Sequence, residues 1–164
     1  VLISPVLSFT AEEIWQGNDF LLAEADSVFL ATLKDLESFN SDLSNADWKR
    51  MLEIKEEVNQ SIEESRAAGG IKGSLDASIE LILNSDDFNL ANKFASEMHF
   101  FLIVSECNIL QGDSLKISVS KSSAEKCVRC WHRNKSVGSN SKHPELCNRC
   151  EENLDGPGED RRFA

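Results

Sequence analysis

Cys127-Val128-Arg129-Cys130 and Cys147-Asn148-Arg149-Cys150 are two C-x-x-C pairs, and sixteen residues separate them. Zinc prefers a tetrahedral shell of soft ligands, with zinc–sulfur distances of about 2.3 Å. A two-residue spacer lets both thiols of a pair reach one ion, and about 15 to 20 residues between pairs is the recurrent spacing of such sites. The sequence therefore predicts one structural zinc ion, bound by Cys127, Cys130, Cys147 and Cys150, in a C-terminal zinc-ribbon or knuckle module.

Other interpretations of these residues remain open at this point. The cysteines could instead form a disulfide framework or redox-active dithiols. The opening of the sequence lacks the charged and apolar regions of a secretory signal, so we expect a cytoplasmic protein whose thiols stay reduced and free to bind metal. Either His132 or His143 could replace one thiolate, although four cysteines already complete a closed site. The start at Val1, followed by an apolar stretch, suggests that the sequence is a fragment.

Charge is distributed unevenly along the chain. The formal net charge of −11 argues against a nucleic-acid binder, because phosphate binding normally requires a basic surface. Residues 1–120 hold eight basic and twenty-one acidic side chains, a net charge of −13, whereas residues 121–164 hold nine and seven, a net charge of +2. A phosphate-binding surface is therefore expected only near the zinc site. No apolar run approaches the roughly 18 residues of a membrane helix, so no membrane partner is expected.

Two helices are predicted in the first part of the chain. The first follows Thr10, which can cap a helix while Glu13 reaches back to its amide, and it should turn Ile14 and Trp15 toward a core. The second begins near Ser44, with a weaker capping box to Asp47, and ends at Gly69-Gly70. Its apolar residues recur at helical spacing, at Trp48, Met51, Leu52, Ile54, Val58 and Ile62.

After these glycines the apolar residues alternate from Leu75 to Leu83, which predicts a half-buried strand. A short helix should start at Asp86 or Asp87, and strands should follow at 101–110 and 115–119. The predicted fold class is α+β: an N-terminal helical-bundle fragment over 1–68, a small β-α-β-β domain over 69–122, and a four-cysteine zinc finger over 123–164.

Nothing in the residues themselves indicates catalysis. The sequence has no glycine-rich phosphate loop and no Ser/His/Asp grouping at a supporting spacing. Cys107 stands apart from the paired cysteines, and we expect it to be a small buried hydrophobe rather than a nucleophile. The chain alone is therefore expected not to be an enzyme.

The C-terminal motifs resemble the end of bacterial isoleucyl-tRNA synthetase. That family carries a Cys-x-Arg-Cys-Trp knuckle, a His-Pro-x-Leu-Cys-x-Arg-Cys second pair and a Gly-x-Gly-Glu-x-Arg tail, which match Cys127–Trp131, His143–Cys150 and Gly156–Arg161. The stretch from Leu7 to Trp15 is similar to the end of the family's anticodon-binding bundle. Ile71-Lys72-Gly73 departs from the usual Ile-Gly-x of the family.

This resemblance implies that upstream domains, whose signatures are missing here, use ATP to attach isoleucine to tRNA. Residues 1–68 would then end the anticodon-binding domain, and the chain would bind the anticodon end of isoleucine tRNA without catalysing the reaction. Its expected partners are that tRNA and the upstream domains of the same enzyme, which should be monomeric as a whole.

Unstacked bases of RNA are recognised by aromatic stacking, arginine planes and hydrogen bonds to base edges. We therefore expect Trp131 and Arg129 to contact bases, although Trp131 could instead cover the zinc thiolates. Basic and polar neighbours are expected to complete the RNA-binding surface, with phosphate contacts at Arg133, Lys135 and Lys142 and further contacts at His132 and Arg149.

Two rival functions are compatible with the zinc motif. DNA glycosylases of the formamidopyrimidine family carry a similar four-cysteine finger, but their catalytic N-terminal proline and helix-two-turn-helix domain are not visible here. The module could also be a zinc-stabilised protein-interaction domain, in which the acidic helices dock a partner protein.

Overall fold

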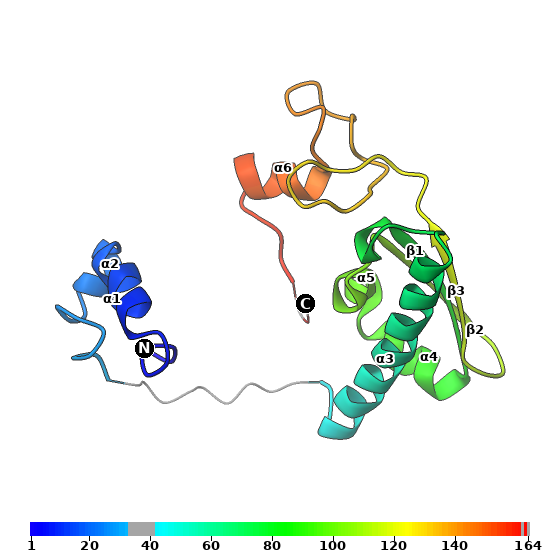
Figure 1. The fold of residues 1–164 in the computed structure, drawn as a ribbon, viewed down its shortest axis with the longest axis horizontal. Helices are drawn as coiled ribbons and strands as arrows, with labels where there is room; N and C mark the ends of the chain where they lie inside the picture. The colour runs from blue at the N-terminus through cyan, green and yellow to red at the C-terminus, as the bar shows by residue number, and fades with distance from the viewer. Residues whose placement is uncertain (33–41, 162, 164) are drawn as a thin grey trace. The chain divides into compact units, whose positions relative to one another are not determined.

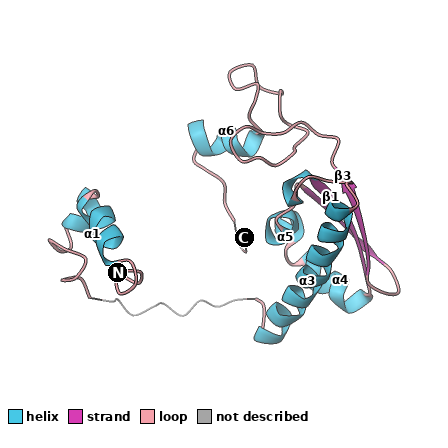
Figure 2. Cartoon of the chain, viewed as in Figure 1, coloured by secondary structure: helices cyan, strands magenta, loops and turns pink. Residues whose placement is uncertain are grey.

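The computed structural model describes residues 1–32, 42–161 and 163 (Figure 1). It divides the chain into two compact units, Val1–Asp42 and Leu43–Ala164. The second unit combines helices with one small three-stranded sheet, so the predicted α+β class is confirmed (Figure 2). None of the helices in the described part of the chain has both the length and the apolar character required to cross a membrane.

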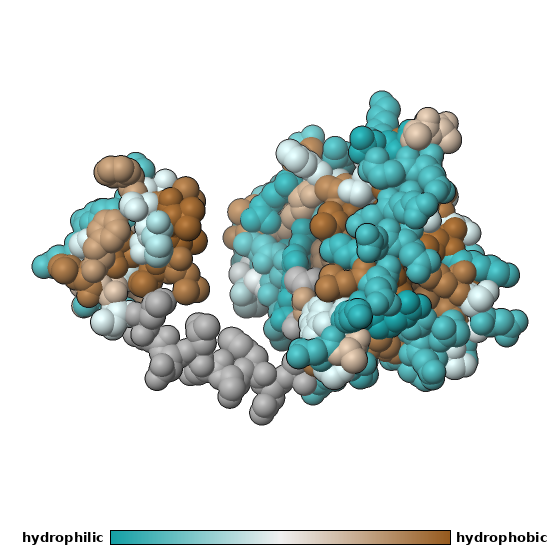
Figure 3. All heavy atoms as spheres, turned by 60° about the horizontal axis from the view of Figure 1, so that its bottom comes forward, coloured by the Kyte–Doolittle hydropathy of each residue, from teal (hydrophilic) through white to brown (hydrophobic). Residues whose placement is uncertain are grey.

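The N-terminal unit contains α1 (Ser8–Gln16) and α2 (Asp19–Leu22). Its small core consists of Ala11, Trp15 and Val28. The indole Nε1 of Trp15 donates to the carbonyl oxygen of Ala25 at 2.7 Å, which closes the returning chain over α1. Large apolar side chains remain on the surface of this unit (Figure 3), including Phe9 at 94% and Val6 at 84% exposure.

The predicted start of the first helix is wrong. Helix α1 begins at Ser8, two residues before Thr10, and its N-cap, Leu7, makes no side-chain capping bond. Glu12 accepts hydrogen bonds from the hydroxyl of Ser27 and the amide of Val28, and so fixes the chain that follows α2. Ile14 is 54% exposed, so only Trp15 of the predicted pair faces the core.

The second unit begins with α3 (Asn45–Ala67), whose predicted capping box is confirmed. The amide of Asp47 donates to the Ser44 hydroxyl at 3.1 Å, and the Ser44 amide donates to the Asp47 carboxylate at 2.8 Å. The chain leaves the helix through Gly69, whose φ of 77° is a conformation that glycine adopts readily. Most of the predicted apolar stripe is buried, although Leu52 is 55% exposed.

Three strands form the sheet, in the order β2-β1-β3. The central β1 (Ala77–Leu83) pairs in parallel with β2 (Glu106–Gln111) and antiparallel with β3 (Lys116–Lys121). The parallel pair is connected through α4 (Ser85–Asn92) and α5 (Met98–Leu102), as the predicted β-α-β-β order requires. Alternation in β1 buries one face of the sheet, with Ala77, Ile79, Leu81 and Leu83 pointing into the core.

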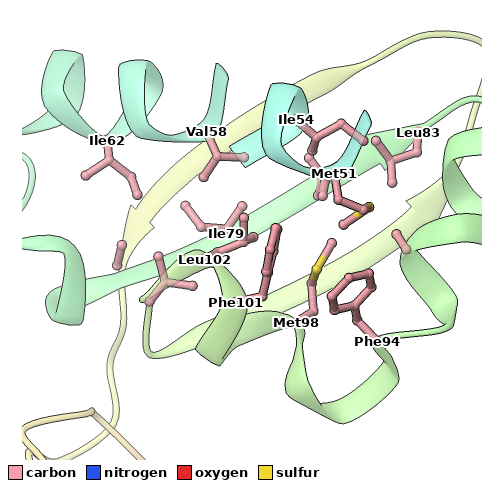
Figure 4. Close-up of a cluster of buried hydrophobic side chains, with 14 of the residues drawn as sticks. Met51, Ile54, Val58, Ile62, Ile79, Leu83, Phe94, Met98, Phe101 and Leu102 are labelled. Carbon is pink, nitrogen blue, oxygen red and sulfur yellow. The ribbon is translucent and has the colours of Figure 1, made fainter. Parts of the chain in front are cut away.

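One core joins α3, the sheet and the α4–α5 segment (Figure 4). In that view Met51, Ile54, Val58 and Ile62 of α3 point toward the same region as Ile79 of β1 and Phe94 and Met98 of the crossover segment. Helix α3 thus packs on the sheet, and the first compact unit ends at Asp42. The proposed domain division at residues 68 and 122 stays a prediction.

The predicted strand over 101–110 is wrong in its first half. Phe101 and Leu102 belong to α5, and β2 begins only at Glu106. Ile103 ends α5 with a φ of 58°, and the amide of Val104 donates to the carbonyl of His99 at 2.9 Å. A short apolar run does not distinguish a buried strand from a buried helical turn, which is the physical reason for the error.

Candidate zinc centre and its surface

The four predicted cysteines converge at one point in the fold. Their Sγ atoms all lie within 4.8 Å of one another, and the Sγ atoms of Cys130 and Cys147 are 3.7 Å apart. Three of the cysteines are at most 1% exposed, whereas Cys130 is partly exposed. A compact set of four sulfurs suits the tetrahedral shell of one zinc ion and has no further position for substrate, as in structural sites.

Local backbone geometry explains how the pairs are brought together. In the first knuckle the amide of Trp131 donates to the carbonyl of Cys127 at 3.0 Å, and the Cys127 amide donates to the carbonyl of His132 at 2.9 Å. The second pair opens helix α6 (Asn148–Asp155), for which Cys147 is the N-cap. The Cys147 amide also donates to Cys127 Sγ at 3.4 Å, which suits a sulfur that carries negative charge.

Neither histidine belongs to this group of sulfurs in the described part of the chain. The His143 Nε2 lies 3.0 Å from the carboxylate of Asp155, and His132 Nδ1 lies 3.2 Å from the carbonyl oxygen of Cys130. Burial lowers the pKa of His132. Both histidines therefore hold other partners in this geometry.

Cys107 lies on the sheet, and no metal-ligating group of the described residues includes it. It is partly buried against the main core, and burial raises the pKa of its thiol to about 12. A protonated thiol is a poor nucleophile, which agrees with the predicted role as a small hydrophobe.

Comparison with known proteins accounts for nearly the whole chain. Residues 1–81 match the anticodon-binding domain of tRNA ligase, and residues 124–153 match the zinc finger found in FPG and IleRS. An isoleucine–tRNA ligase of Dichelobacter nodosus is 44% identical over 99% of this chain, and that of Teredinibacter turnerae is 40% identical over 99%. The chain is similar to isoleucine–tRNA ligases over nearly its whole length.

The chain spans only 18% and 19% of the length of these two relatives. The finger's description covers both FPG and isoleucyl-tRNA synthetases, so the finger alone does not separate the two classes. The match over residues 1–81 does separate them, because it is to an anticodon-binding domain. Within the family motif of the tail, Arg161 is described, whereas the following Arg162 and Ala164 lie outside the described residues.

Trp131 is an exposed aromatic residue of the zinc module. Its side chain is 61% exposed, and its backbone adopts a φ of 68°, which is uncommon for a residue other than glycine. The Nζ of Lys126 lies 5.7 Å from the indole centroid, within cation–π range. Arg129, in the same knuckle, is also exposed. Sequence reasoning overlooked Lys126, whose position just before the first cysteine was its only signal.

The remaining predicted RNA contacts do not share one environment. Lys135 is exposed, whereas Lys142 Nζ lies 2.6 Å from the carboxylate of Asp155. The Nε of Arg133 donates to Asp76 at 2.7 Å, and Arg133 Nη1 donates to the Ala124 carbonyl at 3.1 Å. This arginine connects the zinc module to the start of β1.

The guanidinium of Arg149 is 4.8 Å from the ring centroid of Phe100 in α5. A second guanidinium, that of Arg161, is 4.1 Å from the same centroid. Phe100 and Arg161 were not among the predicted site residues. Phe100 belongs to an apolar run, and such a run predicts only that its side chains are buried in a core. Its position beside the zinc module therefore depends on the tertiary fold.

Proposed function

We propose that this chain binds the anticodon end of isoleucine tRNA as the C-terminal part of an isoleucine–tRNA ligase. Upstream domains of the same enzyme would activate isoleucine with ATP and attach it to the tRNA in the cytoplasm. In this proposal the chain is not itself catalytic, and the whole enzyme is monomeric. The similarity to isoleucine–tRNA ligases and the anticodon-binding match support it.

The observation that carries the proposal is the exposed indole of Trp131 beside a four-sulfur centre. A zinc ion bound by Cys127, Cys130, Cys147 and Cys150 would fix the backbone of the knuckle and would supply only structural constraint. Trp131 would then present a rigid aromatic face at little cost in conformational entropy. Stacking of one base on such a face contributes about 1–3 kcal/mol. Arg129 would add a guanidinium plane or base-edge hydrogen bonds.

The upstream domains are the proposed partner of the N-terminal unit. Its exposed apolar residues frame a groove of about 350 Å³, lined by Ile3, Ile14, Trp15 and Leu21 among others. The anticodon-binding match includes this unit, and the relatives are several times longer than this chain. We infer that helices of the same domain in the full enzyme cover this groove.

A binding competition tests the proposed function. The zinc-loaded chain is mixed with isoleucine tRNA at one stated salt concentration, and a non-cognate tRNA or a DNA duplex is added as competitor. Preference for isoleucine tRNA that disappears on chelation supports anticodon recognition. Preference for the duplex would favour the glycosylase-like alternative, and binding to neither nucleic acid would favour a protein-interaction role.

A further inference from the structure

A groove lies where the zinc module and the C-terminal tail meet the helical layer of the second unit. The chain leaves α6 and returns toward α5 (Figure 1). The groove has a volume of about 400 Å³, which falls in the range of about 300–1,000 Å³ typical of ligand sites. Its lining residues come from α3, α5, the first knuckle, α6 and the tail, and they include Lys55, Phe100, Ile103, His132, Arg149 and Arg161.

The chemistry of this groove combines positive charge with aromatic surface. Three of the lining side chains are cationic: Lys55, Arg149 and Arg161. The two guanidiniums converge on one carboxylate oxygen, Oε1 of Glu159, at 3.2 Å and 2.7 Å. Glu159 neutralises one positive charge and holds both arginines in place.

Phe100 forms the aromatic part of the wall. Arg161 and Arg149 lie over its ring, and Lys55 Nζ lies 4.9 Å from the neighbouring Phe101 ring. Bases of single-stranded nucleic acid stack on guanidinium planes as well as on aromatic rings, and their phosphates pair with the same cations. A purely apolar partner would leave these cations desolvated, at a substantial cost in free energy.

His132 provides an independent observation that indicates a ligand. Its Nε2 is buried and has no hydrogen-bond partner among the described residues. The ring's other nitrogen, Nδ1, faces the carbonyl oxygen of Cys130, and a carbonyl only accepts. In the neutral ring Nδ1 therefore carries the proton and Nε2 is an acceptor. A buried acceptor without a partner is unfavourable, so a donor from a bound molecule would stabilise the site.

We propose that this groove binds one unpaired nucleotide of the tRNA, with its phosphate near Lys55, Arg149 and Arg161 and an N–H or O–H donor at His132 Nε2. The proposal rests on the proposed tRNA-binding function. It extends the RNA-binding surface from Trp131 past its neighbour His132 into the groove. Phosphate lacks a donor at neutral pH, so the donor is either a base N–H or the ribose 2′-hydroxyl. Lys55, Phe100 and Arg161 thereby join the RNA-binding surface.

Lys55 offers the sharpest test because α3 also carries Lys49, an exposed lysine that does not line the groove. The full zinc-loaded chain and its Lys55→Gln and Lys49→Gln variants are titrated with the anticodon stem-loop of isoleucine tRNA at several salt concentrations. We expect Lys55→Gln to weaken binding about threefold to tenfold and to lower the salt slope by about one, because one phosphate contact is lost. Lys49→Gln should bind like the parent chain.

A second variant, Phe100→Leu, keeps an apolar side chain but removes the ring, and it should also weaken binding. Zinc content and thermal unfolding show whether each variant is folded. If Lys55→Gln and Phe100→Leu both bind like Lys49→Gln while Trp131→Ala loses binding, the groove is not a nucleotide site and the proposed function stands. If even the parent chain fails to bind the stem-loop, the proposed function fails and this proposal fails with it.

A stem-loop with 2′-deoxy sugars in the loop identifies the donor at His132. Weaker binding of this probe by the parent chain, with no such difference in His132→Leu, assigns the donor to a 2′-hydroxyl. Equal binding of the two probes by the parent chain, with His132→Leu weaker on both, assigns it to a base N–H. His132→Leu that binds both probes like the parent chain would overturn the role of His132.

Discussion

Arg133 of the zinc module and Asp76 at the start of β1 form an ion pair, with Nε and Oδ1 2.7 Å apart. The two side chains are only 21% and 16% exposed, so water screens the pair less than it screens a surface pair. The Arg133 amide also donates to the Ser105 hydroxyl at 2.7 Å. One residue therefore fixes the zinc module to the end of the sheet where β1 and β2 begin, through both its backbone and its side chain.

The Arg133–Asp76 pair predicts that Asp76→Asn loosens the zinc module without removing its metal. We expect about 1–3 kcal/mol lower unfolding free energy, because the partly buried guanidinium loses its charged partner. Hydrogen exchange should become faster around residues 124–134. Asp113→Asn, at the exposed turn between β2 and β3, is the matched control. Unchanged exchange in Asp76→Asn would show that the backbone contacts alone hold the module.

Metal removal should unfold the zinc module selectively. Its buried residues are chiefly the cysteines themselves, whereas the α3–sheet core contains no part of the four-sulfur cluster. We expect Cys150→Ser or chelation to abolish zinc binding and to disorder α6, while the resonances of β1 persist. Cys107→Ser should keep one zinc ion per chain. Retention of stoichiometric zinc by Cys150→Ser would contradict the proposed ligand set.

Trp131→Ala should weaken binding of isoleucine tRNA while zinc stays at one ion per chain. The expected loss is about 1–3 kcal/mol, the contribution of one stacked base. Val128→Ala changes another exposed apolar residue of the same knuckle and serves as the control. Loss of zinc from Trp131→Ala would instead indicate that the indole shields the thiolates.

Lys135 and Lys142 should affect the salt dependence of tRNA binding more than its specificity. Each phosphate contact that is lost lowers the salt slope by about one. We expect the larger change for Lys135→Gln, because Lys142 already pairs with Asp155 and must give up that interaction to bind phosphate. Lys72→Gln is the control, because Lys72 is an exposed lysine between α3 and β1, outside the zinc module. A changed preference among tRNAs would mean that these lysines contact bases.

The Arg50–Asp87 pair predicts a loss of stability in acid. Arg50 donates through Nε and Nη2 to the two carboxylate oxygens of Asp87, both at 2.8 Å, and these bonds hold the pKa of Asp87 below its usual value. The Asp87 side chain is 8% exposed, so water screens the pair little when the carboxylate is ionised. It is present above the unfolded pKa of about 4 and is lost as the pH falls through the lower folded value.

Unfolding of the parent chain and of Asp87→Asn between neutral and acidic pH measures this contribution. We expect the parent chain to be more stable by about 1–3 kcal/mol at neutral pH, with the difference disappearing in acid. Comparison of the two chains removes the effects of other carboxylates and of zinc release, which both share. A difference that does not change with pH would assign the stability to packing rather than to charge.

Local signals were predicted well where their partners are close in sequence. The capping box at Ser44 and Asp47 and the two cysteine knuckles need only residues a few positions apart, so their geometry follows from spacing. The prediction at Thr10 failed because the helix already begins at Ser8. Thr10 and Glu13 therefore lie inside the helix and not at its start. The helical state of Phe101 and Leu102 depends on packing against α3 and β1, which no local pattern records.

The sequence by itself determined the four-cysteine cluster and the α+β class, because spacing and alternation specify which groups can meet within one knuckle or one strand. The tertiary structure decided which basic side chains pair across the fold and which residues gather in one groove. Arg133 is paired with Asp76, 57 residues away, whereas Lys55, Phe100 and Arg161 are brought to one groove from α3, α5 and the tail. Long-range packing sets these neighbours, and residue spacing along the chain carries no information about them.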